Sequence, residues 1–84
     1  QVNVMYESVA HLGKDIVAVI LTGMGHDGRD GMHQIKDKGG YCIAQDEETC
    51  VVYGMPKSVI DAGLADEICP LPRIAEAIEA AVRR

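Results

Sequence analysis

The chain has 84 residues, a formal net charge of -5 and a hydrophobic fraction of 48%. A chain of this length forms at most one small domain, and its apolar content argues against disorder. Its lysines form no basic patch, so nucleic-acid binding is not expected. Its apolar runs are far shorter than the roughly 18 residues of a membrane span, and nothing at its start resembles a signal peptide. We therefore expect a soluble, cytoplasmic protein without membrane insertion.

The segment 2–12 is expected to form a helix and the segment 15–21 a strand. Apolar residues in the first segment recur at steps of three or four, which places them on one helical stripe. They are Val2, Met5, Val9 and Leu12. The second segment, DIVAVIL, is a continuous apolar run rich in β-branched residues. Such a run is typical of a strand covered on both faces of a parallel sheet.

A second helix and a second strand follow the glycine-rich loop. Met32 and Ile35 alternate with charged residues, which predicts a short amphipathic helix that ends at Gly39 and Gly40. The next segment, YCIAQ at 41–45, is predicted to be a strand. A strand, a glycine loop, a helix and a strand within this span form a βαβ unit.

The rest of the chain predicts a helix, a short strand and a terminal helix. Residues 54–63 carry Pro56, which a first helical turn tolerates, and end at Gly63. Residues 65–71 hold only a short strand before Pro70, and Pro72 opens a terminal helix with one apolar face. The three cysteines lack paired C-x-x-C spacing, which predicts reduced core thiols and not a zinc site.

The stretch LTGMGHDGRDGM, residues 21–32, contains Gly23, Gly25 and Gly28 at the spacing of a dinucleotide-binding loop. It follows a predicted strand and opens a predicted helix, and Asp46 ends the next strand, where a ribose-binding acid would lie. Asp27 opposes this interpretation, because its carboxylate would face the phosphates at the helix N-terminus.

The same residues allow other interpretations. The glycines could make a tight turn in which Asp27 or Asp30 caps the helix. His26 and His33 could join these two carboxylates around a metal, although His and Asp at mixed spacing often occur by chance. Asp27 could instead orient the histidine of a Ser-His-Asp triad, with a backbone N–H of the loop stabilising an oxyanion.

Two linked motifs decide between these interpretations. LTGMGHDGRDGM, followed by AQDEETCVVYGMP, strongly resembles the C-terminal part of the catalytic domain of the chemotaxis protein-glutamate methylesterase (CheB) family. The resemblance runs in register through residues 21–56 and extends more loosely to VNVMYESVA and DEICPL. It implies removal of methyl groups from chemoreceptor methylglutamates, deamidation of receptor glutamines, and no cofactor or metal.

The resemblance also implies roles for single residues. Asp27 matches the triad aspartate, and Met24 matches the residue whose backbone N–H contributes to the oxyanion hole. The serine and histidine come from segments upstream of Gln1, so this chain alone is expected to be inactive. Further candidates are expected to line the cleft, because both loops leave one edge of a parallel sheet. These are Thr22, Gly23, Gly25, Gln45 and Glu47.

The expected architecture is therefore an α/β, parallel-sheet, three-layer (Rossmann-like) half of a methylesterase domain. Residues 1–84 would be the C-terminal fragment of that single domain, with the upstream segments and any receiver domain absent. The expected partners are the upstream part of the same domain and methyl-accepting chemoreceptors. A dinucleotide-binding half-domain and a noncatalytic interaction module remain as alternatives.

Overall fold

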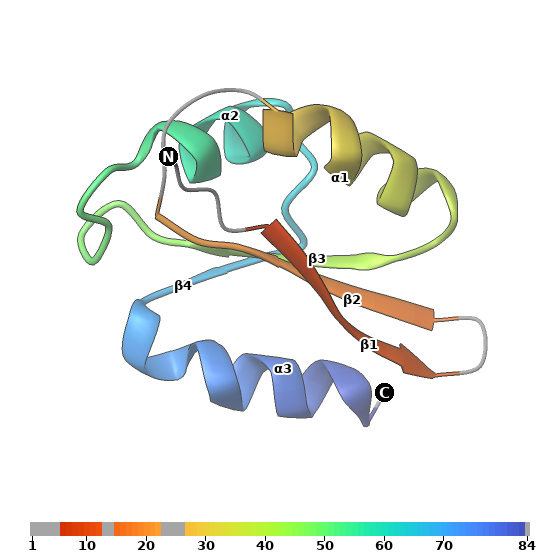
Figure 1. Cartoon of the computed structure of the whole chain (residues 1–84). Helices are drawn as coiled ribbons and strands as arrows, with labels where there is room; N and C mark the ends of the chain where they lie inside the picture. Colours follow the sequence, from red (N-terminus) through yellow and green to blue (C-terminus); the bar gives the residue numbers. More distant parts are fainter. Residues whose placement is uncertain (1–5, 13–14, 23–26, 84) are drawn as a thin grey trace.

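The computed structural model describes residues 6–12, 15–22 and 27–83, and within them the side chains of 16–22 and 29–83 (Figure 1). This part of the chain contains one four-stranded sheet in the order β1-β2-β3-β4. The strands are β1 (Tyr6–Leu12), β2 (Asp15–Ile20), β3 (Tyr41–Gln45) and β4 (Glu67–Cys69). Strands β2, β3 and β4 are parallel, whereas β1 runs antiparallel to β2.

Helices cover both faces of the sheet. Helices α1 (Asp27–Asp37) and α2 (Gly54–Asp61) lie on one face, and α3 (Ile74–Val82) lies on the other (Figure 1). A short 3-10 turn, η1 (Leu71–Arg73), links β4 to α3. The result is the predicted three-layer α/β arrangement. The terminal helix begins at Ile74 and not at Pro72, because the residues before it form this tighter turn.

The two central strands are buried on both faces, as their sequences predict. Side chains alternate along a strand, so Ala18 and Ile20 of β2 face α1 and α2, whereas Val17 and Val19 face α3. Strand β3 repeats this pattern, with Ile43 on the α3 side. Apolar side chains therefore pack on both faces of the central strands, and polar functional groups are expected at the strand ends.

Glycines end the first two helices, as predicted. Gly39 has φ +84° and Gly63 has φ +75°, a conformation that favours glycine. The N–H of the following residue then donates back to the helix, from Gly40 to the Ile35 carbonyl at 2.9 Å and from Leu64 to the Val59 carbonyl at 3.1 Å. This pattern is a Schellman C-cap, and it turns the chain directly into β3 after α1.

The helix predicted for residues 2–12 is wrong in its described part, because residues 6–12 form strand β1. The register of β1 against β2 shifts between Ser8 and Ala10. The physical reason lies in β2, a buried strand whose N–H and C=O groups need partners on both edges. Residues 6–12 pair with the edge that β3 leaves open. The spacing of apolar residues in this segment carries no information about its pairing with β2.

Candidate active site

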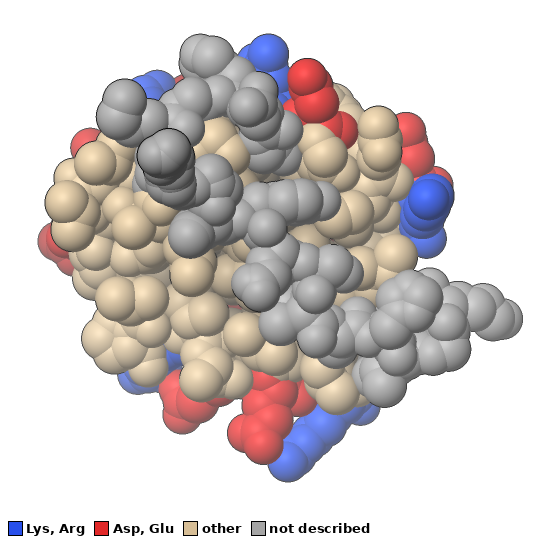
Figure 2. Space-filling model, viewed as in Figure 1, with Lys and Arg blue, Asp and Glu red and all other residues tan. Residues whose placement is uncertain are grey.

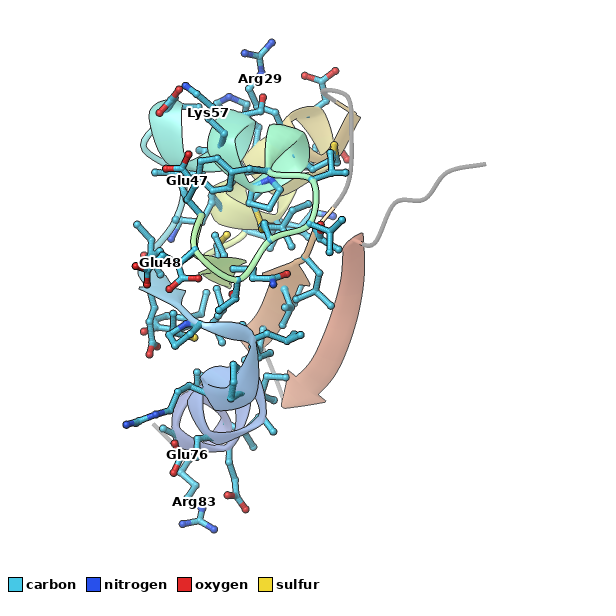
Figure 3. All side chains as sticks on the ribbon, turned by 90° about the vertical axis from the view of Figure 1, so that its left-hand side faces the viewer. Arg29, Glu47, Glu48, Lys57, Glu76 and Arg83 are labelled. Carbon is cyan, nitrogen blue, oxygen red and sulfur yellow. The ribbon has the colours of Figure 1, made fainter. Side chains whose placement is uncertain are left out.

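The carboxyl ends of β2, β3 and β4 meet at one edge of the sheet, where open α/β folds place their ligands. The loop after β2 contains the glycine motif, and the loop of residues 46–53 follows β3. Figure 3 looks onto this edge and shows Glu47 and Glu48 on the loop after β3. Both side chains are exposed. This edge is the candidate active site.

Thr22 is the last described residue before the glycine motif, and both of its polar groups are engaged. Its backbone N–H donates to Oε1 of Gln45 at 2.9 Å. Its hydroxyl donates to the carbonyl of Val52 at 2.8 Å and accepts the Val52 N–H at 2.7 Å. The end of β2 is therefore tied to the end of β3 and to the loop that follows it.

Gln45 is a buried polar residue, 1% exposed, at the end of β3. Its Nε2 donates to the Thr49 carbonyl at 2.8 Å and to the Thr49 hydroxyl at 3.1 Å. Together with the bond to Thr22, these contacts use both ends of the carboxamide. Gln45 thus bridges two loops from within the protein, and whether it also lines a cleft stays a prediction.

Thr49 was not singled out in the sequence, although the polar turn that contains it has a local signal. The Asp46 Oδ1 accepts the Thr49 N–H at 3.1 Å and the Thr49 hydroxyl at 2.7 Å, a turn typical of Asp followed by Thr three residues on. The Thr49 hydroxyl also accepts the Leu71 N–H at 3.0 Å, which adds the segment after β4. Because the Asp46 carboxylate stabilises this turn, it is a poor candidate for holding a ribose.

The residues predicted to carry the chemistry lie partly outside the described part of the chain. Asp27 is the first residue of α1, immediately after the glycine loop, but its side chain is outside the described side chains. Met24, Gly23 and Gly25 lie outside the described residues, as does His26 of the metal interpretation. A carboxylate in a first helical turn is stabilised by the helix dipole. Asp27 is therefore compatible with a catalytic role at the start of α1, and that role stays a prediction.

Cys50 lies close to this edge and is partly buried. Burial raises the pKa of the Cys50 thiol above its ordinary value, and the nearby Thr22 hydroxyl lowers it by less. A thiol with a raised pKa is a poor nucleophile at neutral pH, because the thiolate is the reactive form. Cys50 is therefore not proposed as a nucleophile.

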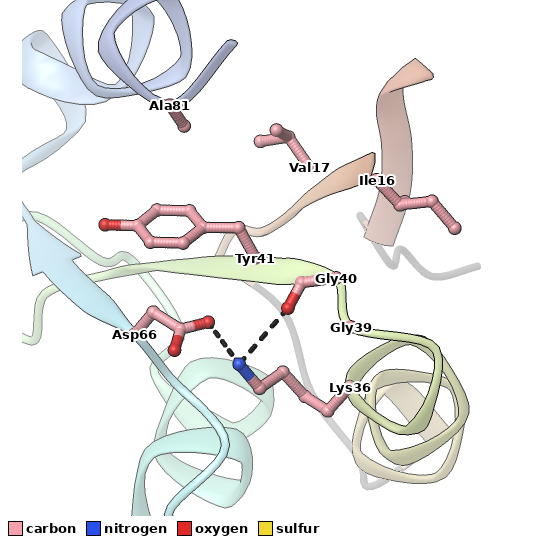
Figure 4. A pocket seen from close by; sticks show the side chains of 8 residues that line it. All are labelled: Ile16, Val17, Lys36, Gly39, Gly40, Tyr41, Asp66 and Ala81. Carbon is pink, nitrogen blue, oxygen red and sulfur yellow. Dashed lines mark hydrogen bonds and ion pairs between the residues drawn. The ribbon is translucent and has the colours of Figure 1, made fainter. Parts of the chain in front are cut away.

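A cavity of about 310 Å³ lies at the opposite edge of the sheet, between the end of α1 and the start of β3 (Figure 4). Lys36 donates there to Asp66 and to the carbonyl of Gly40, at 2.5 and 3.2 Å. Tyr41, which also lines the cavity, donates its hydroxyl to Glu67 at 3.0 Å. Because these polar groups form hydrogen bonds and an ion pair with neighbouring residues, we interpret the cavity as part of the packing and not as a ligand site.

Charged groups do not gather into a metal site in the part of the chain that the structure describes. Asp30 and His33 are exposed on α1. On the face seen in Figure 2, the blue and red side chains lie mainly around the outline and mix in sign. Among the described residues, no helix is long and apolar enough to span a bilayer.

Known proteins resemble this chain along nearly its whole length. A family model described as CheB methylesterase matches residues 1–78. A protein-glutamate methylesterase/protein-glutamine glutaminase of Desulfitobacterium hafniense is 54% identical over 84 residues, which is 99% of this chain and 21% of that protein. A second such enzyme, from Pseudomonas aeruginosa, is 51% identical over 85 residues, covering 99% of this chain and 24% of that protein.

A solved structure supports the same relationship. The methylesterase catalytic domain of Thermotoga maritima CheB superposes with a TM-score of 0.71 at 57% identity, covering 73% of this chain and 32% of that one. The chain thus spans between a fifth and a quarter of the length of the two relatives named above.

Proposed function

The chain belongs to the CheB methylesterase family, and from that premise we propose that it is the C-terminal part of the catalytic domain of a cytoplasmic chemoreceptor methylesterase. The full-length protein would hydrolyse glutamate methyl esters on methyl-accepting receptors and would deamidate receptor glutamines. The observation that carries the proposal is the match of 54% identity over 84 residues.

Asp27 is proposed as the third member of a Ser-His-Asp triad. Its support is its place as the first residue of α1, at the edge where parallel strands present catalytic groups. A carboxylate there would accept a hydrogen bond from the histidine, hold its tautomer and stabilise the imidazolium that forms during attack. The histidine and the serine would come from the upstream part of the same domain.

The reaction would proceed through an acyl-enzyme. The serine oxygen attacks the ester carbonyl while the histidine takes its proton, and the backbone N–H of Met24 stabilises the resulting oxyanion. The C–O bond to the methoxy group then breaks, and the histidine returns the proton so that methanol leaves. Water hydrolyses the acyl-serine and regenerates the enzyme. With a glutamine substrate, ammonia leaves in place of methanol.

Glu47 is kept as a residue that lines the cleft, because it is exposed on the loop that leaves the same edge as the glycine motif. Its carboxylate would meet the receptor substrate or a neighbouring cleft residue. Unchanged turnover in a Glu47→Gln variant of the full-length protein would remove it from the site.

The proposal is tested by methanol release from methylated receptor. The full-length protein is expected to release methanol, and the 84-residue chain alone is expected to release none because it spans only 21–24% of the length of the related enzymes. Release by the chain alone, or none from the full-length protein, would overturn the proposal. A titration with NADH separates the dinucleotide alternative, for which binding is required and which the engaged Asp46 disfavours.

A further inference from the structure

The ends of three strands are joined by one hydrogen-bonded group of residues, which we call the strand-end network. Its members are Thr22, Gln45, Asp46, Thr49, Val52 and Leu71. Thr22 follows β2, Gln45 ends β3 and Leu71 follows β4. The backbone N–H of Asp46 adds a direct bond to the Cys69 carbonyl of β4, at 2.9 Å.

The centre of this network is the Gln45 carboxamide. It is 1% exposed, and burying such a group is costly unless its hydrogen bonds are made. Here the oxygen accepts the Thr22 N–H, and the nitrogen reaches two acceptors on Thr49. A fully paired buried amide has one orientation, because turning it over would set its NH₂ group against the Thr22 N–H. Gln45 therefore fixes the position of the Thr22 backbone N–H.

The Thr22 hydroxyl adds a second attachment. It exchanges two hydrogen bonds with the backbone of Val52, in a manner that resembles a strand pair. Thr22 is thereby held through its backbone N–H by Gln45 and through its hydroxyl by the loop after β3. Neither the Gln45–Thr22 nor the Thr22–Val52 hydrogen bonds belong to the apolar packing between the sheet and its helices.

Thr22 is two residues before Met24 and five before Asp27. Consecutive Cα atoms are about 3.8 Å apart, so Thr22 is only two residues along the chain from the residue proposed to supply the oxyanion N–H. We propose that Gln45 and Thr22 are positioning residues of the methylesterase reaction, which set the point where the chain enters the glycine loop. This inference rests on the proposed function. Neither residue touches the reacting atoms in this proposal, and both act through the loop.

The test uses four variants of the full-length protein, of which two remove contacts of the network, one retains them and one lies outside it. Gln45→Met keeps the volume and removes both hydrogen-bonding ends, and Thr22→Val keeps the shape and removes the hydroxyl. Thr22→Ser retains the hydroxyl and is the conservative rescue. Glu48→Gln changes an exposed side chain of the same loop and serves as the matched control.

Displacements near 1 Å reduce turnover by about 100-fold in enzymes, so kcat is expected to fall about tenfold to 100-fold in Gln45→Met and Thr22→Val. KM should stay within about twofold, because substrate binding is not the step affected. Thr22→Ser and Glu48→Gln should retain turnover close to the unmodified protein. A kcat in Gln45→Met and Thr22→Val equal to that of the unmodified protein, or an equal loss in Thr22→Ser and Thr22→Val, would overturn the inference.

Amide hydrogen exchange at Thr22 tests the network without relying on activity. The Thr22 N–H is expected to exchange faster in Gln45→Met than in the unmodified protein, because it loses its acceptor. Unchanged exchange would overturn the inference even if the protein is an active methylesterase. Absence of methanol release from the unmodified protein would instead contradict the proposed function, and with it the catalytic role assigned to the network.

Discussion

Lys36 and Asp66 form an ion pair with 2.5 Å between Nζ and Oδ2, which joins the last turn of α1 to the residue before β4 (Figure 4). The same carboxylate oxygen accepts the backbone N–H of Cys42 at 2.8 Å. Asp66 therefore links a helix and two strands at the amino ends of the sheet. The fold is held at this edge by Asp66 and at the opposite edge by the strand-end network.

Replacing Asp66 with Ala should destabilise the protein by about 1–3 kcal/mol, because the N–H of the buried Cys42 loses its acceptor. Asp66→Asn keeps an oxygen acceptor and should cost less than Asp66→Ala. The matched control is Asp61→Ala, which breaks the exposed ion pair with Lys57 and should cost much less than Asp66→Ala, because exposed ion pairs contribute little to stability. Chemical denaturation of each variant measures these differences. Equal costs at Asp66 and Asp61 would contradict the assignment.

Gly40→Ala should destabilise the protein by about 1–3 kcal/mol through overpacking. A Cβ at this position would lie 2.9 Å from the Ile35 carbonyl oxygen and 3.2 Å from that of Ile16, and would press on the Ile35 side chain. Gly39 has open space around it, so Gly39→Asn should cost less than about 1 kcal/mol despite its positive φ. Thermal unfolding of both variants checks the order. A larger loss for Gly39→Asn would refute the packing argument.

The three cysteines should differ in their reaction with iodoacetamide. Burial, the larger cause, and the carboxylate of Asp66 raise the pKa of Cys42 to about 12, and Cys42 is fully buried. Cys69 is also buried, whereas Cys50 is partly exposed. We expect Cys50 to be alkylated first at pH 8 and Cys42 last, since reaction needs an accessible thiolate. Peptide mass mapping of the native full-length protein gives the order, and early labelling of Cys42 would contradict the fold.

Stability should fall as the pH rises from about 9 to about 12, in part because of Cys42. Its pKa is raised from 9.0 to about 12 in the folded protein, so the folded state keeps this proton while the unfolded state loses it. The unfolded state then binds fewer protons, and the free energy of unfolding decreases with pH. Comparing unfolding of Cys42→Ala with the unmodified protein across this range isolates the effect. An identical pH slope in both proteins would rule it out.

The elements with local signals could be predicted from the sequence. Strand β2 is read from an uninterrupted apolar run, and the ends of α1 and α2 from Gly39 and Gly63, whose positive φ only glycine adopts readily. Strand β1 could not be predicted in this way. Its conformation depends on pairing with β2, a contact between segments rather than a property of residues 6–12 themselves.

The candidate site likewise contains features that have a local sequence signal and features that depend on contacts between distant segments. The structure places Gln45 at the end of β3, as predicted for that strand, whereas the roles of Asp27 and Gln45 in a cleft stay predictions. The contact between Gln45 and Thr22 spans 23 positions, and no pattern in either segment specifies it. Thr49 had a local signal in its turn with Asp46, but its contact with Leu71 follows only from the folded strand ends.

The most direct test of the central claim is methanol release from methylated receptor by the full-length protein and by its Asp27→Asn variant. Asp30→Asn, which changes an exposed carboxylate of the same helix, is the control. We predict a loss of about 10⁴-fold in kcat for Asp27→Asn, as expected when a triad histidine loses its orienting carboxylate, with unchanged thermal unfolding and a normal rate for Asp30→Asn. A folded Asp27→Asn protein that keeps nearly full activity would contradict the assignment of Asp27 to the triad.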